Sequence, residues 1–381
     1  AAAVFRYRFH ARTTRIMHGA DEPSRELLVL GQVCRVLRGE SYRTARLQAL
    51  RAALAAPDGE AYDAARQLRR VVERHDWQHN IMFLPLAALL FWDLHCAFAV
   101  EAWRRRHGSR VAGWLRDSGE FEALAALATY AWEHPSDPFP EIADGAVPPV
   151  YEAERLSHPL LPAAVAVPND VSLGRAPRVL IVSGSNMSGK TTLLRSVGVN
   201  AVLALAGAPV RAARLRLSPM TPGATLRIED SLQAGRSRFY AEVLRLSQIV
   251  AAARTRPTLF LLDELFHGTN SHDRRDGARG LLSSLLELPT LGLVTTHDLS
   301  LAEIADGLAP AARNVHFDDH LVDGEMHFDY RLKPGPVTRS NAIAIMRAVG
   351  LDVPEADGAP EHPGARPTQP VSAKSRQESA P

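Results

Sequence analysis

The sequence predicts an α/β domain, in which flanking helices cover a mostly parallel sheet, preceded by an all-α helical region. Apolar residues recur at three- and four-residue steps from about residue 43 to residue 132, which is the period of helices that bury one face. Short β-branched or leucine-rich runs then alternate with helical stretches from about residue 178 to residue 315, as in a parallel sheet with crossover helices. A glycine-rich loop joins the first of these runs to a helical stretch.

Length, charge and cysteine content narrow the class of protein. The 381 residues suffice for two or three domains, and 44 Lys+Arg against 42 Asp+Glu identify no nucleic-acid binder. Cys34 and Cys96 lie far apart in the sequence and form no disulfide framework, so we expect a reducing, cytoplasmic location. The chain begins with Ala-Ala-Ala-Val-Phe and has neither an initiator methionine nor a signal peptide, which indicates a fragment of a longer protein.

The helical region is predicted over residues 1–134, incomplete at its N-terminus. One helix is expected from Leu86 to Arg106, ending in three arginines and a stop at Gly108, and another from Phe121 to Trp132. The arginines at 104–106 suit a solvated helix C-terminus, where cations complement the dipole, better than a phosphate contact.

A short apolar run is the only candidate membrane segment. It extends from Ile81 to Trp92, about 12 residues, and contains Pro85. Because roughly 18 to 20 apolar residues are needed to cross a bilayer, we predict a buried helix and no membrane contact.

Composition marks the boundaries of the α/β domain. Residues 135–150 contain several prolines and are predicted to form a strap, because proline interrupts helices. The α/β domain is predicted over residues 151–353. Residues 354–381 are rich in Pro, Ala, Gly, Ser and Glu and are predicted to be a disordered tail.

The glycine-rich loop fits the P-loop pattern GxxxxGK[ST], placed after the predicted strand 179–182 and before a helix. Its backbone can surround a phosphate, Lys190 can pair with the β and γ phosphates, and the Thr191 hydroxyl can ligate magnesium. A chance match is the alternative, which the strand–loop–helix context disfavours. The predicted nucleotide-contact residues are Gly184, Ser185, Asn186, Met187, Ser188, Gly189, Lys190, Thr191 and Thr192.

Two carboxylates follow a second predicted strand, residues 258–262. Ligands bind at this end of the strands in open α/β sheets. Asp263 is therefore predicted to hold magnesium, directly or through water, and Glu264 to orient or deprotonate the attacking water. The alternative is that both carboxylates only cap the next helix.

A histidine follows the third predicted strand, residues 292–296. His297 is expected at the same sheet edge as Lys190 and Asp263, where it can sense the γ phosphate or the attacking water. A structural role is the alternative.

Four segments together resemble the ATPase domain of the MutS family. They read Ser-Gly-Ser-Asn-Met-Ser-Gly-Lys-Thr-Thr at 183–192, Ala-Gly-Arg-Ser-Arg-Phe-Tyr-Ala-Glu at 234–242, Leu-Leu-Asp-Glu-Leu-Phe-His-Gly-Thr-Asn-Ser-His-Asp at 261–273 and Thr-Thr-His-Asp at 295–298. Residues 154–160 are similar to the family's first ATPase strand, and 314–317 with 330–335 to its last strands. The resemblance covers about residues 152–353.

The resemblance implies an ABC-type P-loop ATPase that uses ATP and Mg²⁺ in a composite site shared by two subunits, by default a homodimer. Ser237 would reach the γ phosphate bound by the other subunit, and the segment 268–271 would link the paired sites. The alternative for the Gly-Arg-Ser segment is an N-cap of the next helix, and both roles can coexist. Arg238 and Tyr240 depart from the threonine and methionine commoner in the family.

The resemblance also implies DNA as a partner, in mismatch repair or a related repair or recombination process. The helical region is similar to the family's lever and core helices, and we expect a short paralogue without the mismatch-recognition domain. Phe139, Pro140 and Glu141 match the letters of a Phe-x-Glu mismatch wedge, but they lie in the proline-rich strap, where chance is the better explanation.

Other functions remain open. An ATP-gated scaffold that assembles proteins without reading DNA is the alternative, because the chain shows no basic stripe with interleaved aromatic residues. A transporter ATPase is disfavoured, since no LSGGQ-like segment is present. A small-molecule kinase is disfavoured because the Asp-Glu pair suits water activation.

Overall fold

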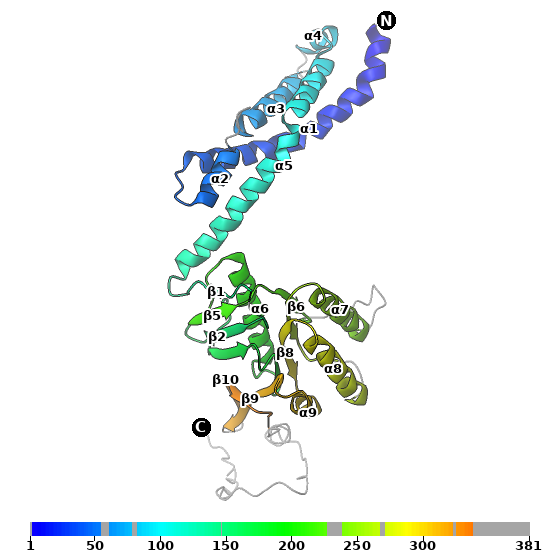
Figure 1. Ribbon diagram of the computed structural model, residues 1–381. Helices are drawn as coiled ribbons and strands as arrows, with labels where there is room; N and C mark the ends of the chain where they lie inside the picture. The colour runs from blue at the N-terminus through cyan, green and yellow to red at the C-terminus, as the bar shows by residue number, and fades with distance from the viewer. Residues whose placement is uncertain are drawn as a thin grey trace, which may run out of the picture. The chain divides into compact units, whose positions relative to one another are not determined.

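The computed structural model describes residues 2–54, 61–77, 82–145, 147–226, 238–266, 271–322 and 325–337. The chain divides into two compact units, one of residues 1–140 with 203–210 and one of residues 141–202 with 211–381. The predicted helical region lies in the first unit and the predicted strands lie in the second (Figure 1).

Among the five helices described within residues 1–140, three form the body of the first unit. The core between α1, α3 and α5 is apolar, with Leu68, Trp103 and Trp114 all buried. The Trp103 indole donates a hydrogen bond to the Ala64 carbonyl at 2.6 Å, so its polar atom is satisfied. The helices are α1 (Ala2–Gly39), α2 (Ala45–Leu54), α3 (Ala61–Asp76), α4 (Leu84–Leu89) and α5 (Trp92–Glu133).

Helix α5 corrects the predicted helix boundaries. It continues through Gly108, where the sequence predicted a stop, because Trp103, Trp114 and Phe121 are all buried along it. A glycine inside a helix costs about 1 kcal/mol, which such packing can exceed. The arginines at 104–106 therefore lie within a helix and are exposed, and the predicted helix C-terminus at this place is wrong.

The apolar run at 81–92 does not form a buried helix. It contains the six-residue helix α4, in which Leu86 and Leu89 are 47% and 75% exposed. Less than two turns of helix offer little surface to bury, and of the side chains described in α4 only Ala87 is buried. No helix within the described residues combines the length and the apolar character needed to cross a membrane.

The second unit contains two sheets, and both are mixed. The smaller sheet has the order β1-β5-β2-β3, in which β1 and β5 are parallel and the other pairs are antiparallel. Residue patterns did not predict this sheet, because its strands are short and carry charged residues, although the resemblance implied a strand at 154–160, which overlaps β2. Its strands are β1 (Glu141–Ile142), β2 (Tyr151–Leu156), β3 (Asn169–Leu173) and β5 (Arg214–Leu217).

The larger sheet has six strands in the order β10-β9-β4-β8-β7-β6. Every pairing from β9 to β6 is parallel, and β10 is antiparallel to β9. The predicted strands at 179–182, 258–262 and 292–296 are confirmed. The strands are β4 (Val179–Ser183), β6 (Thr221–Ala224), β7 (Thr258–Leu262), β8 (Thr290–Thr296), β9 (Ala312–Val322) and β10 (Glu325–Pro334).

Helices cover both faces of the larger sheet (Figure 1). Buried residues of α7, α8 and α9 form one apolar core with β4, β7 and β8. Helix α6 follows the glycine-rich loop and packs on the opposite face, where Gly198 leaves room for Leu261 of β7. The predicted α/β domain, which follows a helical region in the sequence, is thus confirmed. The helices are α6 (Lys190–Ala206), α7 (Arg238–Ala253), α8 (Ser271–Leu286) and α9 (Leu299–Gly307).

Gly292 of β8 gives a test of this packing. A Cβ atom there would lie 2.3 Å from the Phe260 ring and 2.4 Å from the Phe260 carbonyl oxygen. Because backbone cannot yield as a flexible side chain does, Gly292→Ala should lower the free energy of unfolding by about 1–3 kcal/mol. Denaturant unfolding followed by circular dichroism measures the change.

The matched control is Gly280→Ala in α8, where no atom lies within 4 Å of the added methyl group. This change should raise stability by about 0.5–1 kcal/mol, since alanine favours helix. An unchanged stability of Gly292→Ala would contradict the close approach of β7 and β8.

Candidate functional site

The glycine-rich loop begins after β4 and ends where α6 starts at Lys190. Its glycines are required by the backbone, with φ of 148° at Gly184 and 105° at Gly189. A Cβ atom on Gly184 would lie 2.9 Å from Ser188 Oγ and 3.0 Å from the Phe317 carbonyl oxygen. The loop is therefore packed closely on itself and on β9. It leads into the first turn of α6, whose unpaired N–H groups favour an anion.

Two side chains of the loop carry the signature of an anion site. Lys190 is 5% exposed, and its Nζ donates to the carbonyls of Gly184 and Ser185 at 2.7 and 2.6 Å. Burial lowers the Lys190 pKa, and the nearby carboxylates of Glu264, Asp263 and Asp319 oppose this change. Ser188 Oγ is buried and has no hydrogen-bond partner within the part of the chain that the structure describes. A phosphate oxygen would satisfy it.

The Asp263 carboxylate lies between two threonine hydroxyls. Thr191 Oγ1 donates to its two oxygens at 3.1 and 2.9 Å, and Thr295 Oγ1 donates to Oδ1 at 2.7 Å. Thr225 Oγ1 accepts the Asp263 N–H at 3.1 Å. Thr191 and Asp263, the two predicted magnesium ligands, are therefore in direct contact, and their oxygens are the ligand type that Mg²⁺ prefers. The supporting roles of Thr225 and Thr295 were not predicted.

Glu264 and His297 meet at the same edge of the larger sheet. The Glu264 N–H donates to Thr295 Oγ1 at 2.9 Å, and its carboxylate Oε1 lies 3.7 Å from His297 Nδ1. Their side chains are 28% and 40% exposed, so both can reach solvent. The expectation that His297 lies at the same sheet edge as Lys190 and Asp263 agrees with this arrangement, whereas its predicted sensing role stays a prediction.

Two predicted elements of the site, Ser237 and the segment 268–270, fall outside the described residues. Their predicted contacts therefore stay predictions. Helix α7 begins at Arg238, directly after Ser237, and α8 begins at Ser271.

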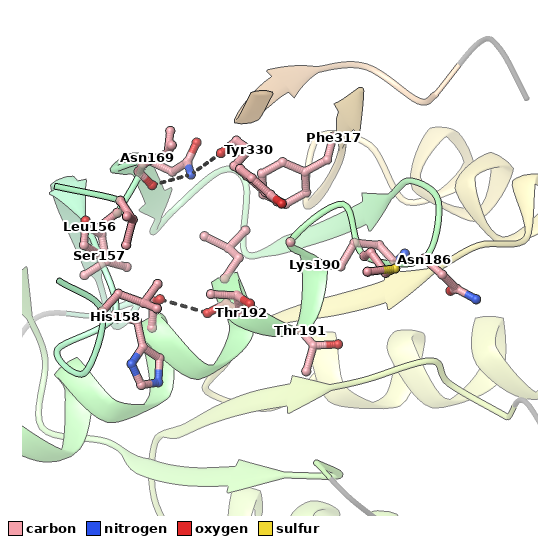
Figure 2. A pocket seen from close by; sticks show the side chains of 18 of the residues that line it. Leu156, Ser157, His158, Asn169, Asn186, Lys190, Thr191, Thr192, Phe317 and Tyr330 are labelled. Atoms are coloured by element: carbon pink, nitrogen blue, oxygen red, sulfur yellow. Dashed lines mark hydrogen bonds between the residues drawn. The ribbon is translucent and has the colours of Figure 1, made fainter. Parts of the chain in front are cut away.

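A pocket of about 490 Å³ extends from the glycine-rich loop along α6 (Figure 2). On the side away from Asn186, Figure 2 shows Leu156, Ser157 and His158, while Phe317 and Tyr330 close it from β9 and β10. Sequence reasoning missed this wall. The lining residues include Leu156, Ser157, His158, Leu161, Val165, Ala166, Val167, Asn169, Asn186, Met187, Lys190, Thr191, Thr192, Glu264, Phe317 and Tyr330.

Asn169 fixes the Tyr330 side of this pocket. Its Nδ2 donates to the Tyr330 carbonyl at 2.9 Å (Figure 2). Its Oδ1 accepts the Leu332 N–H at 2.6 Å. Tyr330 has a left-handed φ of 53° and lies where the β9–β10 pairing shifts register. The amide thus replaces the sheet hydrogen bonds that this irregularity interrupts. The two residues are 161 positions apart, so no local signal in the sequence indicates the contact.

The Phe-x-Glu letters at 139–141 have a structural explanation. The Glu141 carboxylate accepts hydrogen bonds from Arg214 at 3.1 Å and from Arg216 at 3.0 Å within the smaller sheet. These arginines hold the pKa of Glu141 below its usual range. The ion pairs account for the glutamate without a DNA contact.

Comparison with known proteins shows which family the second unit resembles. Residues 180–359 match the family described as MutS domain V. Over 206 residues, 51% of this chain and 24% of the relative, the sequence is 35% identical to Endonuclease MutS2 of Thermomicrobium roseum. It is 36% identical over 197 residues to DNA mismatch repair protein MutS 2 of Halobacterium salinarum, covering 51% of this chain and 23% of that protein.

A longer alignment leads to the same family. The chain is 32% identical over 252 residues to DNA mismatch repair protein MutS of Natronomonas pharaonis, 65% of this chain and 28% of the relative. The aligned part thus spans about a quarter of these relatives' length. The matched region begins in β4 and includes the glycine-rich loop, the Asp-Glu pair and His297. Over this matched region, the chain is therefore similar to domain V of the MutS family.

Proposed function

We propose that this chain binds ATP with magnesium at the glycine-rich loop and hydrolyses it to ADP and phosphate. The buried Ser188 hydroxyl, which has no hydrogen-bond partner among the described residues, carries the proposal, because Ser188 lies two residues before the buried Lys190, where α6 begins. These three features together suit a polyphosphate. The backbone from residue 184 to residue 189 and the hydroxyls of Thr191 and Thr192 would hold the β and γ phosphates.

Thr191 and Asp263 would hold the metal. They bond to each other at 2.9 Å, so their oxygens are close enough to ligate one ion, directly or through water. Magnesium, when bound, supplies positive charge that offsets the negative charge of the phosphates. Thr295 and Thr225 keep Asp263 in place through hydrogen bonds to its side chain and its backbone.

Glu264 would orient the attacking water and accept its proton. It directly follows the metal-holding Asp263, and its N–H is fixed by Thr295. His297, 3.7 Å from the Glu264 carboxylate, would report the state of the γ phosphate by hydrogen bonding. Lys190 would offset the charge that develops on the transferred phosphate.

The remainder of the pocket would receive the nucleoside. Its wall combines apolar side chains with the Tyr330 ring, and aromatic rings offer a face for a base to stack on. The pocket begins at the phosphate-binding loop, so one ligand can occupy both parts.

The active form would be a composite site between two ABC-type ATPase domains of a homodimer. The match of residues 180–359 to MutS domain V supports this proposal, as does the start of α7 directly after Ser237. Ser237 would contact the γ phosphate held by the partner, and segment 268–271 would link the two sites.

ATP binding and hydrolysis would switch the protein between states that hold and release DNA, in mismatch repair or a related process. The printed names of the relatives, which include DNA mismatch repair protein and Endonuclease MutS2, support a DNA-related role.

Glu264→Gln tests the hydrolysis proposal. The amide cannot accept a proton, so kcat should fall by about 100-fold or more. The affinity for ATP should change little, because Glu264 acts on water rather than on the phosphates. The rate of phosphate release measures kcat, and equilibrium nucleotide binding measures the affinity for ATP.

The matched control is Glu303→Gln, an exposed glutamate of α9 that pairs with Arg275 at 3.0 Å. Its rate should equal that of the wild type. A Glu264→Gln protein that hydrolyses ATP at the wild-type rate would exclude Glu264 as the base.

DNA binding is tested by titrating homoduplex, mismatched and branched DNA with and without ATP across a salt series. We expect affinity that depends on the nucleotide and falls steeply with salt, because phosphate contacts release counterions. Intact ATPase activity without DNA binding would contradict the DNA-related role and favour the protein-scaffold alternative.

A further inference from the structure

Helix α7 carries a buried carboxylate that the proposed chemistry does not use. Among the described residues, Glu242 is the only buried carboxylate, and it is 5% exposed. A buried carboxylate is unfavourable unless hydrogen bonds replace its hydration. Its partner in the structure therefore indicates what the residue does.

One such partner is in the turn that follows the Asp-Glu pair. The Phe266 N–H donates to Glu242 Oε1 at 2.8 Å, and Phe266 lies two residues after Glu264. Both Phe266 and Glu264 have left-handed φ, 57° and 49°. This conformation costs roughly 1–2 kcal/mol per residue outside glycine, so surrounding contacts must hold it.

Side chains from two helices hold this turn. Arg274 of α8 donates to the Phe266 carbonyl at 3.2 Å, opposite the N–H that Glu242 accepts. The Phe266 ring contacts the Phe239 ring of α7 with centroids 6.1 Å apart. Glu242 and Phe239 are three residues apart, so one face of α7 makes both contacts.

We infer that Glu242 is a positioning residue that sets the direction of the Glu264 side chain through the backbone of residues 264–266. The inference rests on the proposed hydrolysis at Glu264. Because α7 begins directly after Ser237, the same hydrogen bond links Glu264 to the segment proposed to contact the partner's nucleotide. Movement of α7 would thus change the position of Glu264.

Glu242→Met and Glu242→Gln separate this role from simple packing. Methionine has a similar length but no acceptor, whereas the glutamine carbonyl can still accept the Phe266 N–H. Glu242→Met should lower the single-turnover hydrolysis rate on the order of 10- to 100-fold, since small displacements of catalytic groups cost this much. ATP affinity should stay within about 2-fold of wild type, and Glu242→Gln should keep most of the rate.

The matched control is Gln248→Met, the same apolar replacement at an exposed position of α7, which should behave as wild type. If Glu242→Met does not fold, Glu242→Asp replaces it. Aspartate keeps the charge, but its side chain is one methylene shorter and its oxygens lie farther from the Phe266 N–H. The hydrolysis rate of Glu242→Asp should therefore fall, whereas that of Glu242→Gln should not.

Three outcomes would overturn the inference. One is wild-type hydrolysis in Glu242→Met. Another is an equal loss of rate in the glutamine and methionine variants. The third is a loss of ATP affinity and thermal stability in parallel with the rate, which indicates packing alone. Absence of hydrolysis in the wild type would instead refute the proposed function, and the inference with it.

Discussion

The hydrogen bonds of the Asp263 carboxylate are the interaction on which the rest of the site depends. Thr191 in the first turn of α6 donates to it at 2.9 Å, and Thr295 of β8 donates at 2.7 Å. Because β7 and β8 are parallel neighbours, their carboxyl ends meet at one sheet edge. The positions of Lys190 and Glu264, each one residue away from this cluster, follow from these contacts.

Around this cluster the backbone adopts conformations that are unfavourable for side-chain-bearing residues. Met187, Glu264, Phe266 and Tyr330 all have left-handed φ, and all lie in the glycine-rich loop, the turn after β7 or the pocket wall. Such strain persists only where neighbouring contacts determine the conformation. Glu242 and Asn169 supply contacts of this kind through hydrogen bonds to backbone atoms.

The sequence was informative where chemistry follows from a local pattern. β4, β7 and β8 are fully buried strands with β-branched or leucine-rich sequences, so the local pattern located them and the loops that follow. The Asn169–Tyr330 contact joins residues 161 apart, which no local pattern records. Helix α5 passes through Gly108 because tertiary packing outweighs propensity. Ser237 lies outside the described residues, so its role in a shared site remains a proposal.

The central claim is that Asp263 and Thr191 form the magnesium site of an ATP-binding loop. The most direct measurement is ATP affinity with magnesium and with EDTA, for wild type and for Asp263→Asn. We predict that magnesium strengthens binding to the wild type and has little effect on the variant, while affinity in EDTA is similar in both. An equal effect of magnesium on both proteins would contradict the claim.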